Sequence, residues 1–232
     1  MKHLLKYFFG IIAIAAVSCD SSNEPNLSET GRDYFPLQKN FFQIYDISEI
    51  RYQLEISETL AYELKTLVAD SFPTVDGDVE YVIYRSQRNA GETEWTYLDT
   101  WSARINSREA IMKEENISYL KIKLPLFPGT VWNGNIYNTY DKDEYTLTEI
   151  DKPYTINEES FPDCIVVQQS DNEDYIVFLD QRQEIYAKHV GLIYKETTQL
   201  SYCTSTVKGC IGEQKVESGV IYKQAIKAYG LE

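Results

Sequence analysis

Histidine is the side chain that most often serves both acid–base and metal chemistry, and this chain has 2, His3 and His189. His3 lies in an amino-terminal segment with the features of a cleaved signal, so a metal site or a Ser–His–Asp triad would rest on His189 alone. The residues from Tyr186 to Gly191 have a strand-like pattern in which Gly191 supplies a flexible point. We therefore expect His189 to be a bulge or surface residue and not a catalytic base.

Paired carboxylates are the second source of chemistry, and the chain has 36 acidic residues. Two carboxylates about 5–10 Å apart in a cleft can hydrolyse a glycosidic bond, and the 3 tryptophans and 19 tyrosines would suit stacking on sugar rings. With so many acids, however, close pairs arise by chance. We expect Trp95, Trp101 and Trp132 to be core or strand-edge aromatics. A polysaccharide hydrolase remains an alternative, and no catalytic residue is assigned.

Acidic turns at residues 141–144 and 171–174 are the sequence's candidates for binding calcium. Neither has the spaced ligands and the glycine of an EF-hand loop, and the glycines elsewhere do not form a phosphate-binding motif. We expect solvated turn charges there, with no metal and no cofactor.

The 4 cysteines of the chain fall into three different settings. Cys203 and Cys210 are close enough in sequence to close a short loop by a disulfide in an oxidising compartment, but their spacing does not require one. Cys164 lies in the apolar run Cys164-Ile165-Val166-Val167, which predicts a small buried hydrophobic residue. Cys19 follows the amino-terminal segment.

The first residues combine positive charge with an uncharged apolar stretch over residues 7–17, which is too short to cross a hydrocarbon core of ~30 Å. This pattern predicts a secretory signal over residues 1–18. Ala16-Val17-Ser18-Cys19 resembles the lipobox of bacterial lipoproteins, in which the cysteine becomes the lipidated first residue, although Ala16 stands where leucine is more usual. We predict that lipid on Cys19 anchors the chain to a membrane, at ~0.8 kcal/mol per buried methylene. The alternative is an ordinary cleaved signal followed by a chance cysteine.

The net charge of −14 at pH 7 opposes binding to nucleic acids and to anionic membrane surfaces, so we expect no nucleic-acid partner. Residues 19–33 comprise the lipidated cysteine and a polar stretch that predicts a flexible tether. Residues 34–232 are then a single domain, rich enough in apolar residues to form a sizeable core.

From about residue 34 the apolar residues recur with a period of two, which predicts strands with one buried face. Ile50 and Tyr52 alternate with charged residues on the predicted solvent face, and a break at residues 57–59 predicts a hairpin turn. Residues 107–115 are the only helical candidate. Further strands are predicted at 80–84, 95–105, 119–124, 144–150, 163–169, 174–179, 184–188, 190–196 and 219–227.

Many strands joined by short turns, without long helical segments between them, favour antiparallel pairing. The predicted fold class is therefore all-β, as an antiparallel multi-stranded barrel-like domain or a two-sheet sandwich. Periodicity does not separate these two architectures.

Four fragments together resemble an uncharacterised family of Bacteroidota envelope lipoproteins. They are DYFPLQKNFFQIYDI near the tether, LPLFPGTVWNGNIYN in the middle, EIYAKHVGLIYKE later in the chain, and the ending SGVIYKQAIKAYG. Asn40 and His189 stand where that family tends to have glycine. The resemblance implies an envelope location, often at the outer membrane, but it supplies no activity and no catalytic residue.

The leading functional hypothesis is a membrane-anchored, non-catalytic binding or structural lipoprotein of the cell envelope, with an envelope protein or a glycan as partner. The first alternative is a carrier that encloses an apolar ligand in a barrel cavity.

Overall fold

The computed structural model describes residues 31–54 and 56–232, which form one 12-stranded antiparallel sheet. The described residues contain one 3-10 turn, η1 (Arg32–Tyr34), and no α-helix. This part of the chain therefore has no helix long and apolar enough to cross a membrane. The strands are β1 (Phe41–Gln53), β2 (Ile56–Pro73), β3 (Val79–Asn89), β4 (Thr96–Ile105), β5 (Glu109–Glu114), β6 (Ile117–Lys123), β7 (Val131–Asn133), β8 (Glu144–Ile156), β9 (Glu159–Asp174), β10 (Phe178–Ala187), β11 (Gly191–Tyr202) and β12 (Val216–Leu231).

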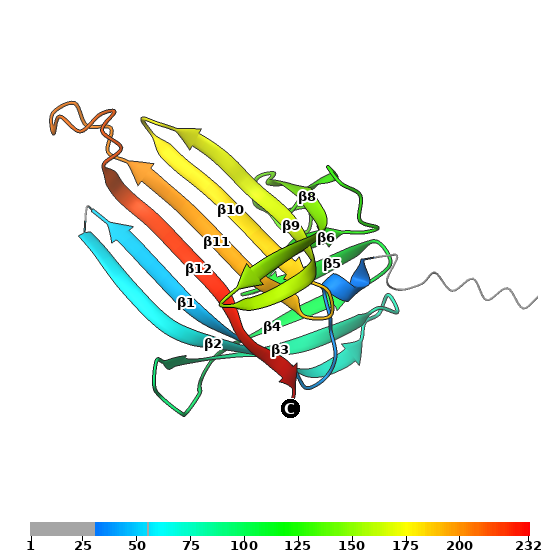
Figure 1. Ribbon diagram of the computed structural model, residues 1–232. Helices are drawn as coiled ribbons and strands as arrows, with labels where there is room; N and C mark the ends of the chain where they lie inside the picture. Colours follow the sequence, from blue (N-terminus) through cyan, green and yellow to red (C-terminus); the bar gives the residue numbers. More distant parts are fainter. Residues whose placement is uncertain (1–30, 55) are drawn as a thin grey trace, which may run out of the picture.

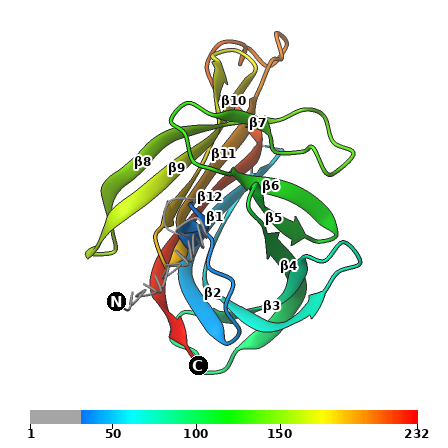
Figure 2. The same ribbon diagram turned by 90° about the vertical axis from the view of Figure 1, so that its right-hand side faces the viewer.

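The sheet is a meander that curls into a nearly closed barrel (Figures 1 and 2). Its order is β6-β5-β4-β3-β2-β1-β12-β11-β10-β9-β8-β7, so the first and last strands of the chain pair with each other. The edge strands β6 and β7 are joined at their seam by the Leu120 N–H, which donates to the Gly134 carbonyl at 2.9 Å, and by Trp132 Nε1–H, which donates to the Leu120 carbonyl at 2.9 Å. The predicted all-β antiparallel class is confirmed, and the architecture is the barrel.

Two hairpins are closed by two-residue turns in which both residues have positive φ. They are Glu115-Asn116 between β5 and β6, at 48° and 70°, and Asn157-Glu158 between β8 and β9, at 47° and 71°.

The predictions for residues 107–115 and 174–179 are wrong. The helical candidate over residues 107–115 contains β5, because pairing with β4 and β6 on its two sides overrides the helix propensity of its Glu, Ala, Met and Lys residues. The strand predicted over residues 174–179 is interrupted by the turn between β9 and β10, which exposes Tyr175, Ile176 and Val177.

The β1–β2 hairpin is confirmed, but its turn and its buried face were predicted wrongly. Gln53 pairs with Ile56, so the turn lies earlier than residues 57–59. Along β1 the buried face carries Tyr45, Ile47 and Glu49, whereas Ile50 on the opposite face is only half-buried. An acid can occupy the buried face because Arg51 Nε lies 2.5 Å from Glu49 Oε1. Alternation predicts a strand, but it does not decide which set of residues faces inward when the interior is partly charged.

Strands β9 and β10 bury apolar side chains on their outer face as well, because the tip of the β8–β9 hairpin folds across the outside of the barrel. Figure 1 shows this hairpin in front of β10–β12. Asn157 Nδ2–H donates to the Ile226 carbonyl at 3.0 Å, and the Tyr229 hydroxyl donates to Glu159 at 2.8 Å. Strand β9 is therefore covered on both faces, which explains its unbroken apolar run. Phe161, Cys164 and Val166 of β9 and Ile185 and Ala187 of β10 belong to a second buried cluster, which also includes Tyr45, Ile47, Leu64, Val190, Ile193 and Ile226. Of these, Tyr45 and Leu64 line the interior of the barrel.

The segment before β1 packs against the barrel. Gly31 is buried, and a Cβ atom there would lie 2.4 Å from Leu126 Cγ. The Tyr34 hydroxyl donates to Asp151 at 2.5 Å, and the Asp33 carbonyl accepts the His189 N–H at 2.7 Å. Residues 31–33, assigned by sequence to the tether, thus contact the folded domain. The signal segment 1–18, Cys19 and the tether up to residue 30 lie outside the described residues.

Candidate functional site

The barrel interior contains a partly open cavity of about 120 Å³. For scale, an engineered core cavity of about 150 Å³ binds benzene, so this space suits a short hydrocarbon chain or one ring. Inward-facing side chains of both halves of the barrel line the cavity, and the segment before β1 contributes Phe35, Pro36 and Leu37. Much of the lining is apolar: Phe35, Leu37, Phe41, Leu64, Val68, Ile83, Met112 and Leu192.

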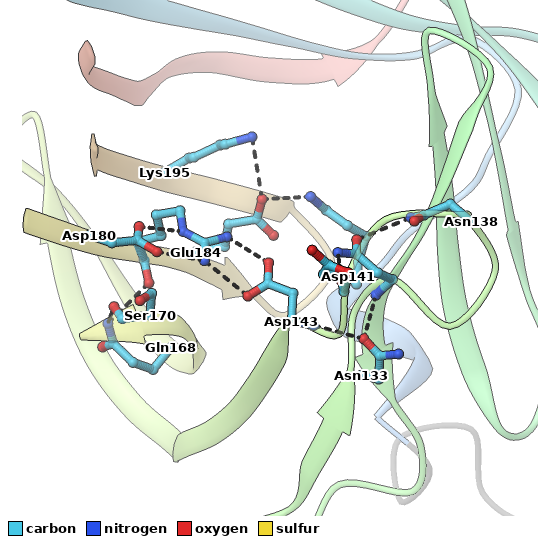
Figure 3. A network of polar contacts seen from close by, with 12 residues as sticks. Asn133, Asn138, Asp141, Asp143, Gln168, Ser170, Asp180, Glu184 and Lys195 are labelled. Atoms are coloured by element: carbon cyan, nitrogen blue, oxygen red, sulfur yellow. Dashed lines mark hydrogen bonds and ion pairs between the residues drawn. The ribbon is translucent and has the colours of Figure 1, made fainter. Parts of the chain in front are cut away.

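A buried network of ionised groups forms one part of the cavity wall (Figure 3). Lys121 Nζ lies 2.7 Å from Glu184 Oε1 and 3.0 Å from Glu114 Oε1. Lys195 Nζ approaches Glu184 Oε1 at 3.6 Å, and the Tyr186 hydroxyl donates to Glu184 Oε2 at 2.5 Å. Only 8% of the Lys121 side chain and 1% of the Glu184 side chain are exposed. Such burial is tolerated because each charge has oppositely charged and hydrogen-bonding partners.

These contacts hold both carboxylates in the ionised form. Burial alone raises the pKa of Glu184, but the neighbouring Lys121 and Lys195 outweigh it and lower the pKa to about 2. The same two lysines lower the pKa of Glu114 against the effect of its burial. A glycosidase needs a carboxylic acid whose pKa is raised, so that it can protonate the leaving group at working pH. Glu114 and Glu184 do not meet that requirement.

A second polar corner of the cavity combines Arg85 of β3 with Trp101 of β4. Arg85 Nη1–H donates to the two carboxylate oxygens of Asp99, at 3.1 and 2.8 Å. The guanidinium carbon lies 3.7 Å from the centroid of the Trp101 ring, in cation–π geometry. Arg85 Nε–H and Trp101 Nε1–H are buried, and neither has a hydrogen-bond partner within the described part of the chain.

The aromatic and histidine positions singled out in the sequence are spread over the fold. His189 is exposed in the turn between β10 and β11 with φ 63°, so the prediction of a bulge or surface residue is confirmed. Trp132 is buried at the β6–β7 seam, and Trp101 lines the cavity. Trp95 is half-buried, with the Arg88 guanidinium carbon 4.2 Å from its ring centroid.

Cys203 and Cys210 form a disulfide with a Cα–Cα distance of 5.8 Å. It closes a loop between β11 and β12, and neither cysteine lines the cavity. Cys164 is a free, buried thiol whose burial raises its pKa to about 11. A thiol in this state is a packing residue and not a nucleophile.

The acidic turns are occupied by groups of the protein itself. The Asp143 carboxylate accepts hydrogen bonds from Arg182 at 2.7 and 2.9 Å, and the Asp174 carboxylate accepts the Ile176 N–H at 2.9 Å. Over residues 31–54 and 56–232, no three His, Cys, Asp or Glu side chains gather in a way that would hold a metal ion.

A second, polar hollow of about 260 Å³ lies over β9, β10 and β11. No tryptophan or tyrosine is among its lining residues, so it offers no ring on which a sugar could stack. The hollow is lined by Gln168, Asp171, Gln181, Arg182, Gln183, Glu196 and Thr198.

Sequence reasoning missed the charged residues of the cavity wall. Alternation placed Lys121 opposite Leu120 and Ile122 and therefore in solvent, whereas all three are buried. The fragment EIYAKHVGLIYKE could have indicated the ion pair between Glu184 and Lys195, because it forms two paired strands. Glu184 is its first residue and Lys195 its last but one. These two residues pair directly across β10 and β11.

No family model matches the sequence, and no curated protein matches it either. The structure is similar to that of a Bacteroides fragilis protein described as exported and as having a YmcC-like fold. The TM-score is 0.43 at 11% identity, over 84% of this chain and 98% of that one. It is also similar to a Parabacteroides distasonis protein described as a lipoprotein. Here the TM-score is 0.40 at 12% identity, over 85% of this chain and 98% of that one.

Proposed function

We propose that the chain is a lipid-anchored lipoprotein of the cell envelope whose barrel binds a small, largely apolar ligand without transforming it. The observation that carries this proposal is the interior cavity of about 120 Å³, lined mainly by apolar side chains. Burying apolar ligand surface there supplies about 25 cal/mol per Å². A structural barrel of the same kind would fill this space with side chains.

The ionised part of the wall supports binding over catalysis. The charges of Lys121 and Lys195 balance those of Glu114 and Glu184. The pKa values of Lys121, Glu114 and Glu184 are moved away from the neutral range in which general acids and bases operate. The ion pairs among these side chains hold that part of the cavity wall in one conformation.

The envelope location is supported by the signal-like segment that ends at Cys19 and by the Cys203–Cys210 disulfide. Disulfides persist in oxidising compartments and are rare in the cytosol. We assign the outer membrane as the site of anchorage, with lipid on Cys19 as the contact to the bilayer.

Native mass spectrometry tests the binding function. The domain from Asp20 onward is secreted behind a non-lipoprotein signal, purified from its own host's periplasm and measured before and after denaturation. We expect a non-covalent adduct that is lost on denaturation and whose mass identifies the ligand. A mass equal to that of the bare chain would contradict the carrier function and direct the search to protein or glycan partners.

Fractionation tests the anchorage separately. The full chain should incorporate labelled fatty acid and sediment with outer membranes, whereas the Cys19→Ala chain should not incorporate the label. Equal labelling of both chains would overturn the assignment.

A further inference from the structure

Among the described residues that line the cavity, two buried side-chain donors and no buried side-chain acceptor lack a hydrogen-bond partner. Arg85 Nε–H and Trp101 Nε1–H are buried without a partner, and both residues line the cavity. A buried donor without a partner is unfavourable, so such groups point to a partner that binds there. The Arg85 side chain is only 11% exposed, so bulk water does not serve it freely.

Most of the other polar groups of the cavity wall are engaged with one another, and Lys195 lies 3.6 Å from Glu184. Glu184 accepts from Lys121 and Tyr186, Lys121 also contacts Glu114, and Gln43 Nε2–H donates to the Val190 and Leu192 carbonyls. The Tyr45 hydroxyl donates to the Leu192 carbonyl at 3.0 Å, and the Tyr222 hydroxyl donates to Gln224 at 2.8 Å. A ligand bearing an ammonium group would find the carboxylates of this wall already paired.

The free donors define the missing group as an acceptor, and one of them belongs to a guanidinium, which favours a carboxylate. The apolar remainder of the lining requires a hydrocarbon body, and the cavity volume limits that body to a short chain or one ring. Building on the proposed binding function, we infer that the ligand is a small apolar carboxylic acid. Its carboxylate accepts hydrogen bonds from Arg85 Nε–H and Trp101 Nε1–H.

Both donors can be observed directly by ¹H–¹⁵N correlation spectroscopy of the delipidated, ligand-stripped domain. The 3 tryptophans give three indole signals, and the Trp101→Phe chain assigns the one from Trp101. The probes are hexanoate, 1-hexanol and hexylamine, which each have a chain of six carbons and differ in the group at its end. Hexanoate should shift the Trp101 indole and Arg85 Nε–H signals saturably and bind at least about tenfold more tightly than 1-hexanol.

Trp101→Phe and Trp132→Phe form a matched pair of variants. Trp101→Phe removes a donor that has no partner in the free protein and keeps an aromatic ring beside Arg85, so it should change the urea midpoint little and weaken hexanoate about tenfold. Trp132→Phe removes the donor to the Leu120 carbonyl, so it should lower the urea midpoint and leave hexanoate affinity unchanged. Arg85→Lys retains the positive charge beside Asp99 but loses Nε–H, and it should weaken hexanoate as well.

The binding experiments distinguish a failure of the carboxylate assignment from a failure of the proposed binding function. Equal binding of hexanoate and 1-hexanol, or undiminished hexanoate binding by Trp101→Phe, would overturn the carboxylate assignment while leaving a binding cavity. Tighter binding of hexylamine would also overturn it. If none of the three probes binds and the periplasmic protein carries no adduct, both proposals fail.

Discussion

Lys121 Nζ on β6 lies 2.7 Å from Glu184 Oε1 on β10, and these strands are not neighbours in the sheet. The ion pair therefore connects the edge strand β6, through the barrel interior, to a strand in the other half of the sheet. Strand β6 has ladder hydrogen bonds with β5 only, so this interior contact helps to hold it in place.

Glu184→Gln should destabilise the barrel, because it leaves Lys121 buried with Glu114 as its remaining carboxylate. Removing one partner of a buried pair costs roughly 3–5 kcal/mol, since the other charge stays desolvated. Urea unfolding at pH 7 measures the loss. Glu94→Gln, at an exposed carboxylate, is the control and should change the free energy of unfolding by less than about 0.5 kcal/mol. An equal effect of both substitutions would show that the cross-barrel contact is not stabilising.

The same ion pair predicts how stability depends on pH. The pKa of Glu184 falls from an ordinary 4.5 to about 2 in the folded protein, so the unfolded state binds more protons between these values. The resulting stabilisation is complete above pH 4.5 and is lost as the pH falls through 2, in total on the order of 3 kcal/mol. We expect the unfolding free energies of the native and Glu184→Gln chains to differ most near pH 7 and to converge toward pH 2. A difference that is constant from pH 7 to pH 2 would contradict this.

The fold class was predictable because the period of two is a property of any strand with one covered face, as in β1, where burial alternates from Tyr45 to Glu49. The choice between barrel and sandwich was not predictable, because it depends on the pairing of β1 with β12 at the two ends of the chain. The candidate site could not be predicted from the sequence either. Lys121 and Glu184 are far apart in sequence, and each, taken alone, has the pattern of a solvent-facing strand residue.

Asn40 and His189 occupy two positions where the backbone adopts the left-handed conformation. At these positions the family that the chain resembles tends to have glycine, and φ is 68° and 63°. Left-handed backbone conformation explains the preference, because a side chain there crowds the neighbouring carbonyl. The left-handed conformation at these two positions could therefore be predicted from the family's glycines, but not from the alternation of apolar residues.

His189→Gly should therefore stabilise the domain slightly. The substitution relieves about 1–2 kcal/mol of left-handed strain and costs about 0.5–1 kcal/mol of added chain entropy in the unfolded state, for a net gain near 0.5 kcal/mol. Thermal unfolding measures the gain. His189→Ala keeps the strain and serves as the control, so an equal gain with alanine would assign the effect to the imidazole and not to the backbone.

The Cys203–Cys210 disulfide should stabilise the domain moderately, because its cysteines are only 7 positions apart. The chain-entropy relation for so short a loop gives about 2 kcal/mol. We expect the double Cys203→Ser, Cys210→Ser chain to lose about this much in urea, and dithiothreitol to destabilise the native chain alone. Thiol titration of the denatured domain from Asp20 onward should find only Cys164 before reduction. Titration of further thiols before reduction would show that the bond does not form.

Gly219 is the glycine whose replacement should damage the barrel most. Its φ is 134°, and a Cβ atom there would lie 2.1 Å from the Gln199 carbonyl oxygen, a backbone atom of the paired strand β11. Gly219→Ala must therefore push β12 from β11, and since β12 joins the two halves of the barrel, we expect a loss above about 3 kcal/mol. Gly91→Ala is the matched control, because Gly91 has φ 87° but a Cβ atom there would meet no other atom within 4 Å, so only backbone strain of about 1–2 kcal/mol applies. If urea unfolding shows equal losses for the two alanine chains, the close approach of β11 to β12 does not limit stability, and backbone conformation alone explains the glycine.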